Sequence, residues 1–249
     1  MTRAALFTPF ELIDGDRARG IVCIADHARR DLPEEYGSLG LPEAEFERHI
    51  AYDIGVEAVT RGLAEALRVP AILATFSRLL IDPNRGEDDP TLIMRLSDGA
   101  VVPGNRTLTE EERAARIARY YRPYHAAIAE VIDRALTCGV VPILLSVHSF
   151  TPAWRGRVRP WHAAVLWDKD PRLAQPLLAE LRTDAALLVG DNEPYTGRLK
   201  GDCLWRHGTS RGLPHALLEI RQDLIATEAG QAEWAGRLVD AMQRVLAAA

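Results

Sequence analysis

The stretch Val140-Val-Pro-Ile-Leu-Leu-Ser-Val147 is followed directly by His148 and Ser149. Its long run of apolar side chains predicts a buried strand, and His148 then lies at the carboxyl end of that strand. Strands that are apolar throughout are typical of a parallel sheet covered by helices on both faces. The stretch therefore favours an α/β fold, and it places an imidazole at the edge of the sheet where such folds bind ligands.

Similar apolar runs alternate with helical patterns along the rest of the chain. Further strands are predicted at residues 21–25, 71–76, 163–167 and 216–220, with a short one at 186–189. Helices are predicted over about 43–68, 109–138, 171–183 and 229–248, and Thr109-Glu-Glu-Glu112 is a capping box for the second of them. Residues 82–107, rich in Pro, Gly, Asp and Asn, predict a long loop of the kind that is usually functional. This order predicts one domain, residues 1–249, with a mixed, largely parallel central sheet.

Composition narrows the classes of partner. The 249 residues are 47% hydrophobic, enough for a sizeable core, and carry a net charge of −5 without a basic tract, so no nucleic-acid partner is expected. No stretch approaches the roughly 20 apolar residues of a membrane span, and residues 1–20 lack a signal-peptide core, which predicts a cytoplasmic protein with no membrane partner. Cys23, Cys138 and Cys203 lie far apart and form no CxxC pair, which favours reduced thiols.

Two histidines, His27 and His148, each follow a predicted strand. A neutral imidazole in that position can bind a metal through one nitrogen while the other donates to a neighbouring acceptor. Catalytic zinc commonly has three protein ligands of the His and carboxylate types. The remaining ligand stays open at this point. Asp53 and His49, four residues apart on the expected helix, are candidates, as are Glu34 and Glu35 before it, and a structural role for the histidines is the alternative.

Other polar residues sit beside predicted strands. Glu219 interrupts the apolar run Ala-Leu-Leu-Glu-Ile, where an unpaired carboxylate is costly to bury, so it is either a general base or the partner of a cation such as Arg221. Arg78 and the pair Asn84-Arg85 occur in or beside the long loop, and arginine binds carboxylates in a bidentate way. A small acidic substrate is therefore expected, unless these arginines are ordinary surface residues.

An ordered set of motifs resembles the N-formylglutamate amidohydrolase family over residues 20–245. The motifs are Asp26-His-Ala28, His49-Ile-Ala-Tyr-Asp-Ile-Gly55, Ser77-Arg-Leu-Leu-Ile-Asp-Pro-Asn-Arg85, Tyr120-Tyr-Arg-Pro-Tyr-His125, Ser146-Val-His-Ser149, Asp191-Asn-Glu-Pro-Tyr195 and Leu217-Leu-Glu-Ile-Arg-Gln-Asp-Leu224. A more distant resemblance to zinc carboxypeptidases implies a phosphorylase/hydrolase-like fold. Arg30 stands where those enzymes have the Glu of His-x-x-Glu, and Ala28 stands where some family members carry Ser.

The resemblance implies a zinc site and a reaction. The implied ligands are His27, Asp53 and His148, with Glu219 as base and Arg85, together with Arg78, at the oxyanion or a substrate carboxylate. Asn84 would orient the substrate, and the basic residues of a Gly-rich stretch would form a substrate loop or a plain surface loop; they are Arg198, Lys200 and His207.

The expected reaction is hydrolysis of N-formyl-L-glutamate to formate and glutamate, and the family's best-known setting is histidine degradation. One alternative is the same chemistry on another N-acyl amino acid. The other is a non-catalytic binding protein that has lost the metal. The sequence does not indicate an oligomeric state.

Overall fold

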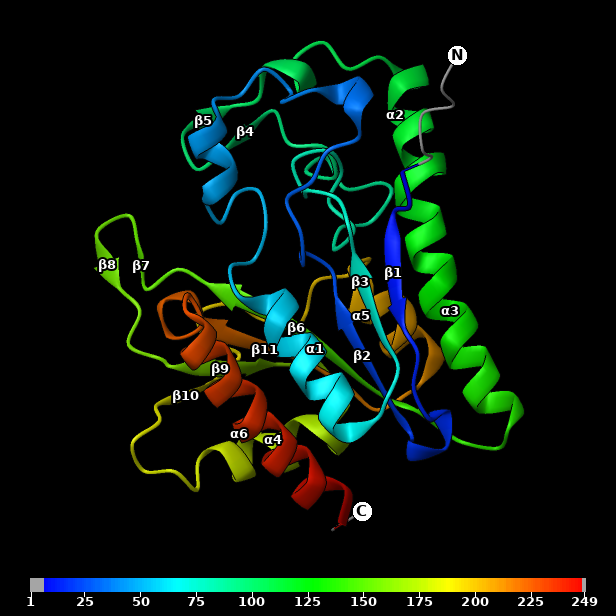
Figure 1. Ribbon diagram of the computed structural model, residues 1–249, viewed down its shortest axis with the longest axis vertical. Coiled ribbons are helices and arrows are strands. Elements are labelled where there is room, and N and C mark those ends of the chain that lie inside the picture. Colours follow the sequence, from blue (N-terminus) through cyan, green and yellow to red (C-terminus); the bar gives the residue numbers. More distant parts are fainter. Residues whose placement is uncertain (1–6, 248–249) are drawn as a thin grey trace.

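The computed structural model describes residues 7–247, and a seven-stranded sheet runs through it (Figure 1). The strands stand in the order β1-β3-β2-β6-β11-β9-β10. The pairs β3/β2, β2/β6, β6/β11 and β9/β10 are parallel, whereas β1/β3 and β9/β11 are antiparallel. The predicted mixed, largely parallel sheet is therefore confirmed. Its strands are β1 (Phe10–Ile13), β2 (Ile21–Ala25), β3 (Ala71–Ala74), β6 (Ile143–Phe150), β9 (Ala163–Leu166), β10 (Val189–Asp191) and β11 (His215–Arg221).

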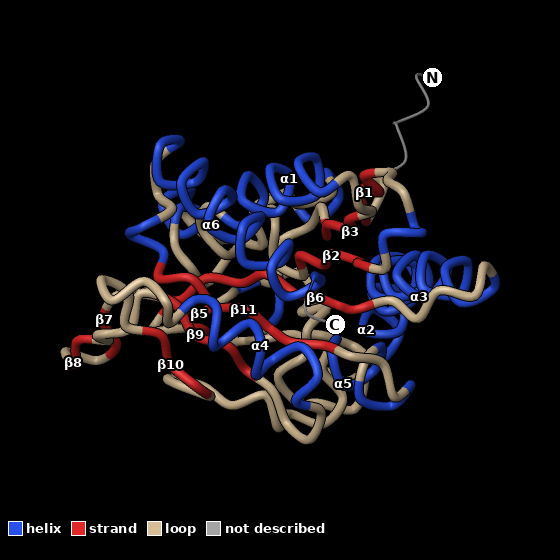
Figure 2. The backbone as a smooth tube through the Cα atoms, turned by 90° about the horizontal axis from the view of Figure 1, so that it is seen from below, coloured by secondary structure: helices blue, strands red, loops and turns tan. Residues whose placement is uncertain are grey.

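Helices cover both faces of this sheet, with α1 and α6 on one side of the strands and α3 and α5 on the other (Figure 2). Successive strand residues point to opposite faces: Cys23 packs in the core with α1, α4 and α6, whereas Ile24 packs in the core with α3. Burying each large aliphatic side chain contributes roughly 1.5–3 kcal/mol. The helices are α1 (Val56–Leu67), α2 (Glu110–Arg116), α3 (Arg122–Thr137), α4 (Pro171–Leu181), α5 (Cys203–His207) and α6 (Glu228–Ala247).

Smaller elements extend from the sheet. A hairpin of β4 (Leu96–Ser97) and β5 (Ala100–Val101) lies in the predicted long loop, and a second one pairs β7 (Ala153–Trp154) with β8 (Arg157–Val158). Short 3-10 turns occur at Arg17–Arg19, Glu34–Tyr36, Glu43–Glu47, Pro103–Asn105, Thr209–Arg211 and Gln222–Leu224. Among the described residues, no helix is both long and apolar enough to cross a membrane.

The predicted helix over 43–68 is wrong in its first half. Residues 43–47 form a 3-10 turn, residues 48–54 are turns and bends, and the α-helix begins only at Val56. Gly55 has φ 81°, a left-handed conformation that an α-helix cannot contain. Ile50 and Ala51 pack instead in a separate apolar cluster with Leu79. Asp53 therefore lies in an irregular segment, where its backbone N–H donates to the carbonyl of His27 at 2.9 Å.

The other predicted elements differ less. The helical stretch predicted at 109–138 contains a π-helical turn at Ile117–Tyr121 between α2 and α3, and the Thr109 hydroxyl caps its start by accepting from the N–H of Glu112. The short strand predicted at 186–189 lies at Val189–Asp191. The edge strand β1 was not predicted, because its four residues show neither clear alternation nor a long apolar run.

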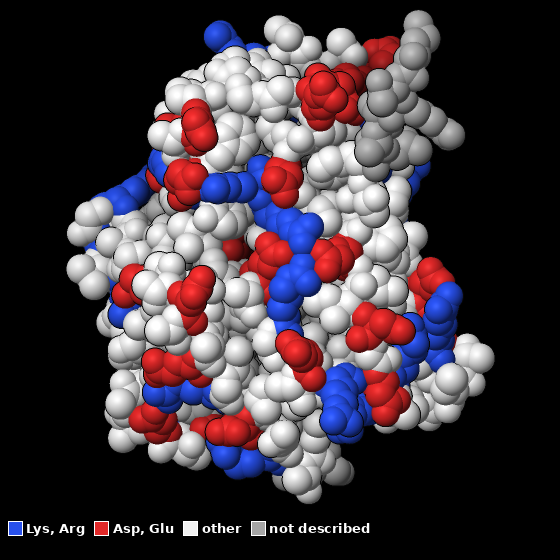
Figure 3. Space-filling model, viewed as in Figure 1, with Lys and Arg blue, Asp and Glu red and all other residues white. Residues whose placement is uncertain are grey.

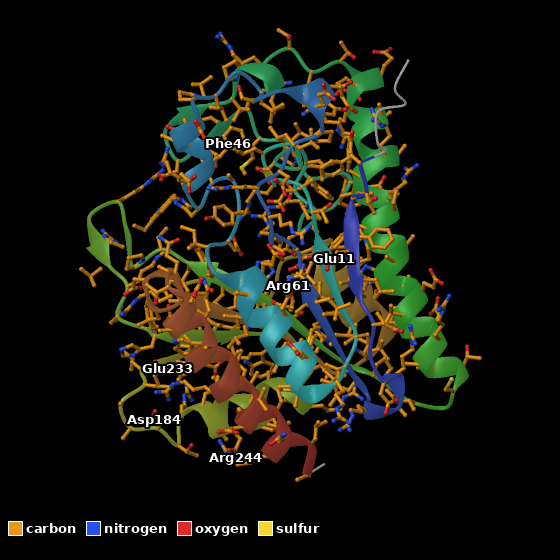
Figure 4. All side chains as sticks on the ribbon, viewed as in Figure 1. Glu11, Phe46, Arg61, Asp184, Glu233 and Arg244 are labelled. Atoms are coloured by element: carbon orange, nitrogen blue, oxygen red, sulfur yellow. The ribbon has the colours of Figure 1, made fainter. Side chains whose placement is uncertain are left out.

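A cluster of four charged residues joins β1 to α1 across the front of the molecule. Arg29 contacts Glu11 at 2.5 Å and Glu57 at 2.7 Å, and Arg61 contacts the same two carboxylates at 2.7 and 2.9 Å. Figure 4 labels Glu11 and Arg61, and Figure 3 shows basic and acidic side chains side by side in this part of the surface. The cluster ties the edge of the sheet to the helix that follows the irregular segment bearing Asp53.

Candidate active site

The carboxyl ends of β2, β3, β6 and β11 meet at one edge of the sheet. His27 follows β2, and His148 lies near the carboxyl end of β6. Glu219 is the direct register neighbour of His148 on β11. Asp53 reaches the same point from the segment before α1. One ligand atom each of His27, Asp53 and His148 lies within 4.8 Å of the others, and all three residues are buried. The structure thus brings together the three residues expected to hold a metal.

Hydrogen bonds orient both imidazoles in the same way. The Nε2 atom of His27 lies 2.7 Å from a carboxylate oxygen of Asp82, and that of His148 lies 3.0 Å from Asp26. Asp82 and Asp26 can each accept the Nε2 proton, and an ion that displaces any proton on Nδ1 would then bind each ring through Nδ1. Both Nδ1 atoms face Asp53 Oδ2, at 3.4 Å from His27 and 2.9 Å from His148. Two Nδ1 atoms and one carboxylate oxygen therefore converge. The Nε2 atom on the opposite side of each imidazole contacts an aspartate, as in many zinc sites.

The electrostatics of this cluster are those of a cation site. Burial alone would raise the pKa values of Asp26 and Asp53, but the neighbouring histidines outweigh it and lower both. Burial alone would lower the pKa of His148, yet hydrogen bonds with Asp26 and Asp53 raise it to about 10. The surrounding carboxylates thus favour positive charge at the point where the imidazoles meet. The donor set of two imidazoles and one carboxylate fits Zn²⁺ or a similar divalent ion.

Glu219 is buried beside this cluster with an unsatisfied oxygen. Its side chain is 8% exposed, and its Oε2 atom has no hydrogen-bond partner among the residues that the structure describes. Burial, reinforced by the charge of Asp53, raises the pKa of Glu219 to about 7, although His148 and His27 oppose the shift. Arg221 pairs with Asp223 at 2.8 Å, so the ion pair considered as the alternative for Glu219 is not formed. Its carboxylate can therefore exchange protons near neutral pH.

The cluster of His27, Asp53, His148 and Glu219 forms one wall of a cavity, and polar groups from the segment after β3 form a second wall. Arg78 contacts Asp82 at 2.7 Å and Asp53 at 3.4 Å, so its charge is largely engaged by the protein. Arg85 donates to the carbonyl of Asn84 at 2.8 Å and has no ion-pair partner in the described part of the chain. Asn84 is fixed by its side-chain oxygen, which accepts from the N–H of Cys203 at 3.1 Å. Of these two arginines, Arg85 is thus the one whose charge no carboxylate of the described residues engages.

These two walls belong to one cavity of about 650 Å³. His27, Asp53, His148 and Glu219 line it, together with Arg78, Asn84 and Arg85. The remaining wall is largely apolar and includes Phe150, Leu166, Trp167, Tyr195, Leu204 and Trp205. Pockets of this size with a few convergent polar groups are typical of small-molecule sites.

The other candidate residues do not join the cluster of His27, Asp53 and His148. His49 lines the cavity but contacts Asp98 at 3.6 Å, and Glu35 accepts from Tyr120 at 3.0 Å. Arg198 is exposed near Asp168, and Lys200 lies over the ring of Trp205. His207 does not line this cavity; it contacts His125 behind α5. The ligand roles considered for His49 and Glu35 stay predictions, and so do the substrate-binding roles of Arg198, Lys200 and His207.

Sequence reasoning missed the residues that support the cluster. Asp26 and Asp82 hold the imidazoles, and Tyr124 donates to Asp26 at 2.9 Å. Asp26 and Asp82 both stand inside the quoted motifs, directly before His27 and two residues before Asn84. Their position in the motifs was therefore a usable signal, but the direction of their side chains was not.

The chain is similar to known proteins over most of its length. Residues 19–226 match the family model described as N-formylglutamate amidohydrolase. The chain is 26% identical to the N-formylglutamate deformylase of Pseudomonas putida over 82% of this chain and 78% of that one. It is similar to a solved gene product of Agrobacterium tumefaciens, with 34% identity, a TM-score of 0.90 and coverage of 98% and 99% of the two chains. It is also similar to the N-formylglutamate amidohydrolase of Ralstonia eutropha JMP134, with 26% identity, a TM-score of 0.74 and coverage of 97% and 98%.

Proposed function

Because the chain belongs to the N-formylglutamate amidohydrolase family, we propose that it hydrolyses N-formyl-L-glutamate to formate and glutamate with the help of a divalent metal, zinc being the ion that its donor set suits. The family's members named N-formylglutamate deformylase support the choice of substrate. The same family setting suggests a place in histidine degradation.

One observation carries the proposal. A buried carboxylate with an unsatisfied oxygen, Glu219, lies next to the convergent donors of His27, Asp53 and His148. An unpartnered buried carboxylate is costly and needs a reason, and a water molecule to be deprotonated is the partner that a hydrolase would give it.

The residues divide the chemistry between them. A divalent ion held by His27, Asp53 and His148 would polarise the acyl carbonyl and make a water more acidic. Glu219 takes a proton from the attacking water and returns one to the departing amine, so that formate and the free amino acid leave. Arg85 binds the substrate's α-carboxylate, and Asn84 orients it. Arg78 keeps Asp53 and Asp82 in place from the side.

Formate release tests this proposal directly. Purified protein loaded with Zn²⁺ is incubated with N-formyl-L-glutamate, and formate and glutamate are quantified together with the bound metal. Equal amounts of both products and a metal-containing protein are expected. A protein that retains no metal after zinc-supplemented expression and releases no formate from any N-formyl amino acid would contradict the proposal and favour the binding protein.

A second candidate is the same reaction on an N-acyl amino acid with an apolar part. The cavity of about 650 Å³ is far larger than N-formylglutamate needs, and one of its walls is apolar. Arg85 is the lining arginine without a carboxylate partner among the described residues, whereas N-formylglutamate carries two carboxylates. A panel that pairs formyl and longer acyl groups with glutamate, leucine and phenylalanine separates the two candidates by their kcat/KM values.

A further inference from the structure

A second group of potential ligands lies behind the active site. His125 comes from α3, and Cys203 and His207 stand at the two ends of α5, four residues apart and hence on one face of that helix. Their Nδ1 or Nε2 and Sγ atoms lie within 4.8 Å of one another, and all three residues are buried. None of the three lines the active-site cavity. We propose that these residues form a second metal site, which binds Zn²⁺ or a similar thiol-preferring divalent ion.

The hydrogen bonds of His125 prepare it as a ligand. Its Nε2 atom lies 3.0 Å from the carbonyl oxygen of Pro83, which can only accept, so Nε2 carries the proton. The Nδ1 atom is then unprotonated and points at Nε2 of His207, 2.9 Å away. A backbone carbonyl that fixes the tautomer of an imidazole is the usual companion of a metal-bound histidine.

Both histidines are neutral, as ligands must be. Burial lowers the pKa of His125 to about 3 and that of His207 to about 4. In the absence of an ion, His207 donates its Nε2 proton to His125. With an ion present, that proton moves to the other nitrogen of His207. Burial and the neighbouring Asp26 raise the pKa of the Cys203 thiol, so the thiol releases its proton to solvent only as the ion binds its sulfur. Two imidazoles and one thiolate with a fourth position open to water form a donor set that zinc accepts.

A cavity gives access to two of the three residues, His125 and His207. A second cavity, of about 340 Å³, is lined by both histidines and by three arginines. Arg122 is paired with Glu87 at 2.9 Å and Arg211 with Asp133, so these two charges are offset, and Arg206 donates to the hydroxyl of Tyr121 at 2.9 Å. The ion would pin α5 to α3, and through the N–H of Cys203 it would hold Asn84 in the active-site cavity. Its role is therefore structural.

Cobalt binding tests the proposal without reference to activity. Protein stripped of metal with a chelator is titrated with Co²⁺ and then Zn²⁺, while the near-ultraviolet band of a cobalt thiolate is recorded. About two equivalents are expected, one for each three-ligand site. The thiolate band should disappear in Cys203→Ser, remain in Cys138→Ser, whose thiol is exposed, and remain in His148→Ala, which loses the other equivalent.

The outcomes separate cleanly. Cobalt uptake by the unaltered protein without a thiolate band would overturn the proposal, and so would a band that survives in Cys203→Ser. If Cys203→Ser fails to fold by circular dichroism, His125→Gln replaces it, and the same loss of the band is required. Added Zn²⁺ should also raise the melting temperature of His148→Ala, which keeps only this second site; an unchanged melting temperature would contradict a structural ion there.

Discussion

At the scale of single residues, the active site depends on which charges are buried together. Glu219 has a pKa of about 7 because burial and the charge of Asp53 disfavour its ionised form. The sequence singled out Glu219 as a base or an ion-pair partner, because a carboxylate in an apolar strand requires an explanation. It did not predict Asp26 and Asp82 as supports for the imidazoles, since periodicity places a residue on an edge of the sheet without telling which neighbour its side chain meets.

The base role of Glu219 predicts the behaviour of Glu219→Gln. Glutamine keeps the shape of the side chain but cannot take up a proton, so we expect kcat for formate release to fall by about 100-fold or more. Bound zinc should be unchanged, because Glu219 is not among the three convergent donors. Glu65→Gln, at an exposed position of α1, serves as the control and should keep full activity. Full turnover in Glu219→Gln would refute the base assignment.

At the scale of elements, the largest difference between the predicted and observed structure is the start of helix α1. The spacing of apolar residues continues back to Ile50 as in a helix. Gly55 has φ 81°, so the helix cannot extend through it, and Ile50 packs in a separate apolar cluster. Sequence patterns register spacing alone, and a glycine within a helical pattern is usually tolerated. In this chain the break has a consequence for the site, because it frees Asp53 to face His27 and His148.

The break predicts that Gly55→Ala is strongly destabilising. A Cβ atom there would lie 2.1 Å from the backbone oxygen of Ile225, and the residue would be forced to keep a left-handed conformation. We expect a loss of about 2 kcal/mol or more in the free energy of unfolding, measured with urea. Gly236→Ala is the matched control: its Cβ would meet nothing within 4 Å on α6, so it should be neutral or stabilising by about 0.5–1 kcal/mol. Equal effects of the two changes would contradict this account.

The charged cluster between β1 and α1 predicts a pH-dependent contribution to stability. Hydrogen bonds with Arg61 and Arg29 lower the pKa of Glu11, and those with Arg29 and Arg61 lower the pKa of Glu57 against the effect of burial. A carboxyl group whose pKa is lowered by folding stabilises the protein fully at pH values above its ordinary pKa, near 4.5. This contribution is lost as the pH falls through the lowered pKa that the group has in the folded protein.

Glu57→Gln should therefore lower the free energy of unfolding at pH 7 by about 0.5–1 kcal/mol, since the cluster is partly exposed and solvent screens it. The difference from the unaltered protein should shrink steadily as the pH falls below 4.5. Glu65→Gln, on the same helix and exposed, is the control and should show no such trend. Urea unfolding at a series of pH values measures both, and a difference independent of pH would show that the charge of Glu57 contributes nothing.

At the scale of the whole molecule, the alternation of strands and helices was enough to predict the class of fold. The sequence did not predict that β1 and β9 run antiparallel to a neighbouring strand. An apolar strand has the same pattern in either direction, and only the connections to other strands determine its direction. The parallel central strands matter most for function. They bring His27, His148 and Glu219, which belong to three separate strand ends along the chain, to one edge of the sheet.

That convergence also makes the fold's stability depend on what the edge holds. Asp26, Asp53 and Asp82 are buried together there with lowered pKa values, and a bound cation would offset their charge. An ion that binds only the folded state at 100 times its Kd adds about 2.7 kcal/mol. For a chain of this length, that corresponds to a rise in melting temperature of roughly 5–10 °C.

Chelation should therefore lower the melting temperature and abolish formate release, and added Zn²⁺ should restore both. In Cys203→Ser, added Zn²⁺ should still raise the melting temperature by binding at this edge. In Asp53→Asn, most of that contribution to the rise in melting temperature should be lost. A melting temperature and a turnover rate that both survive verified metal removal would contradict a catalytic metal at this edge.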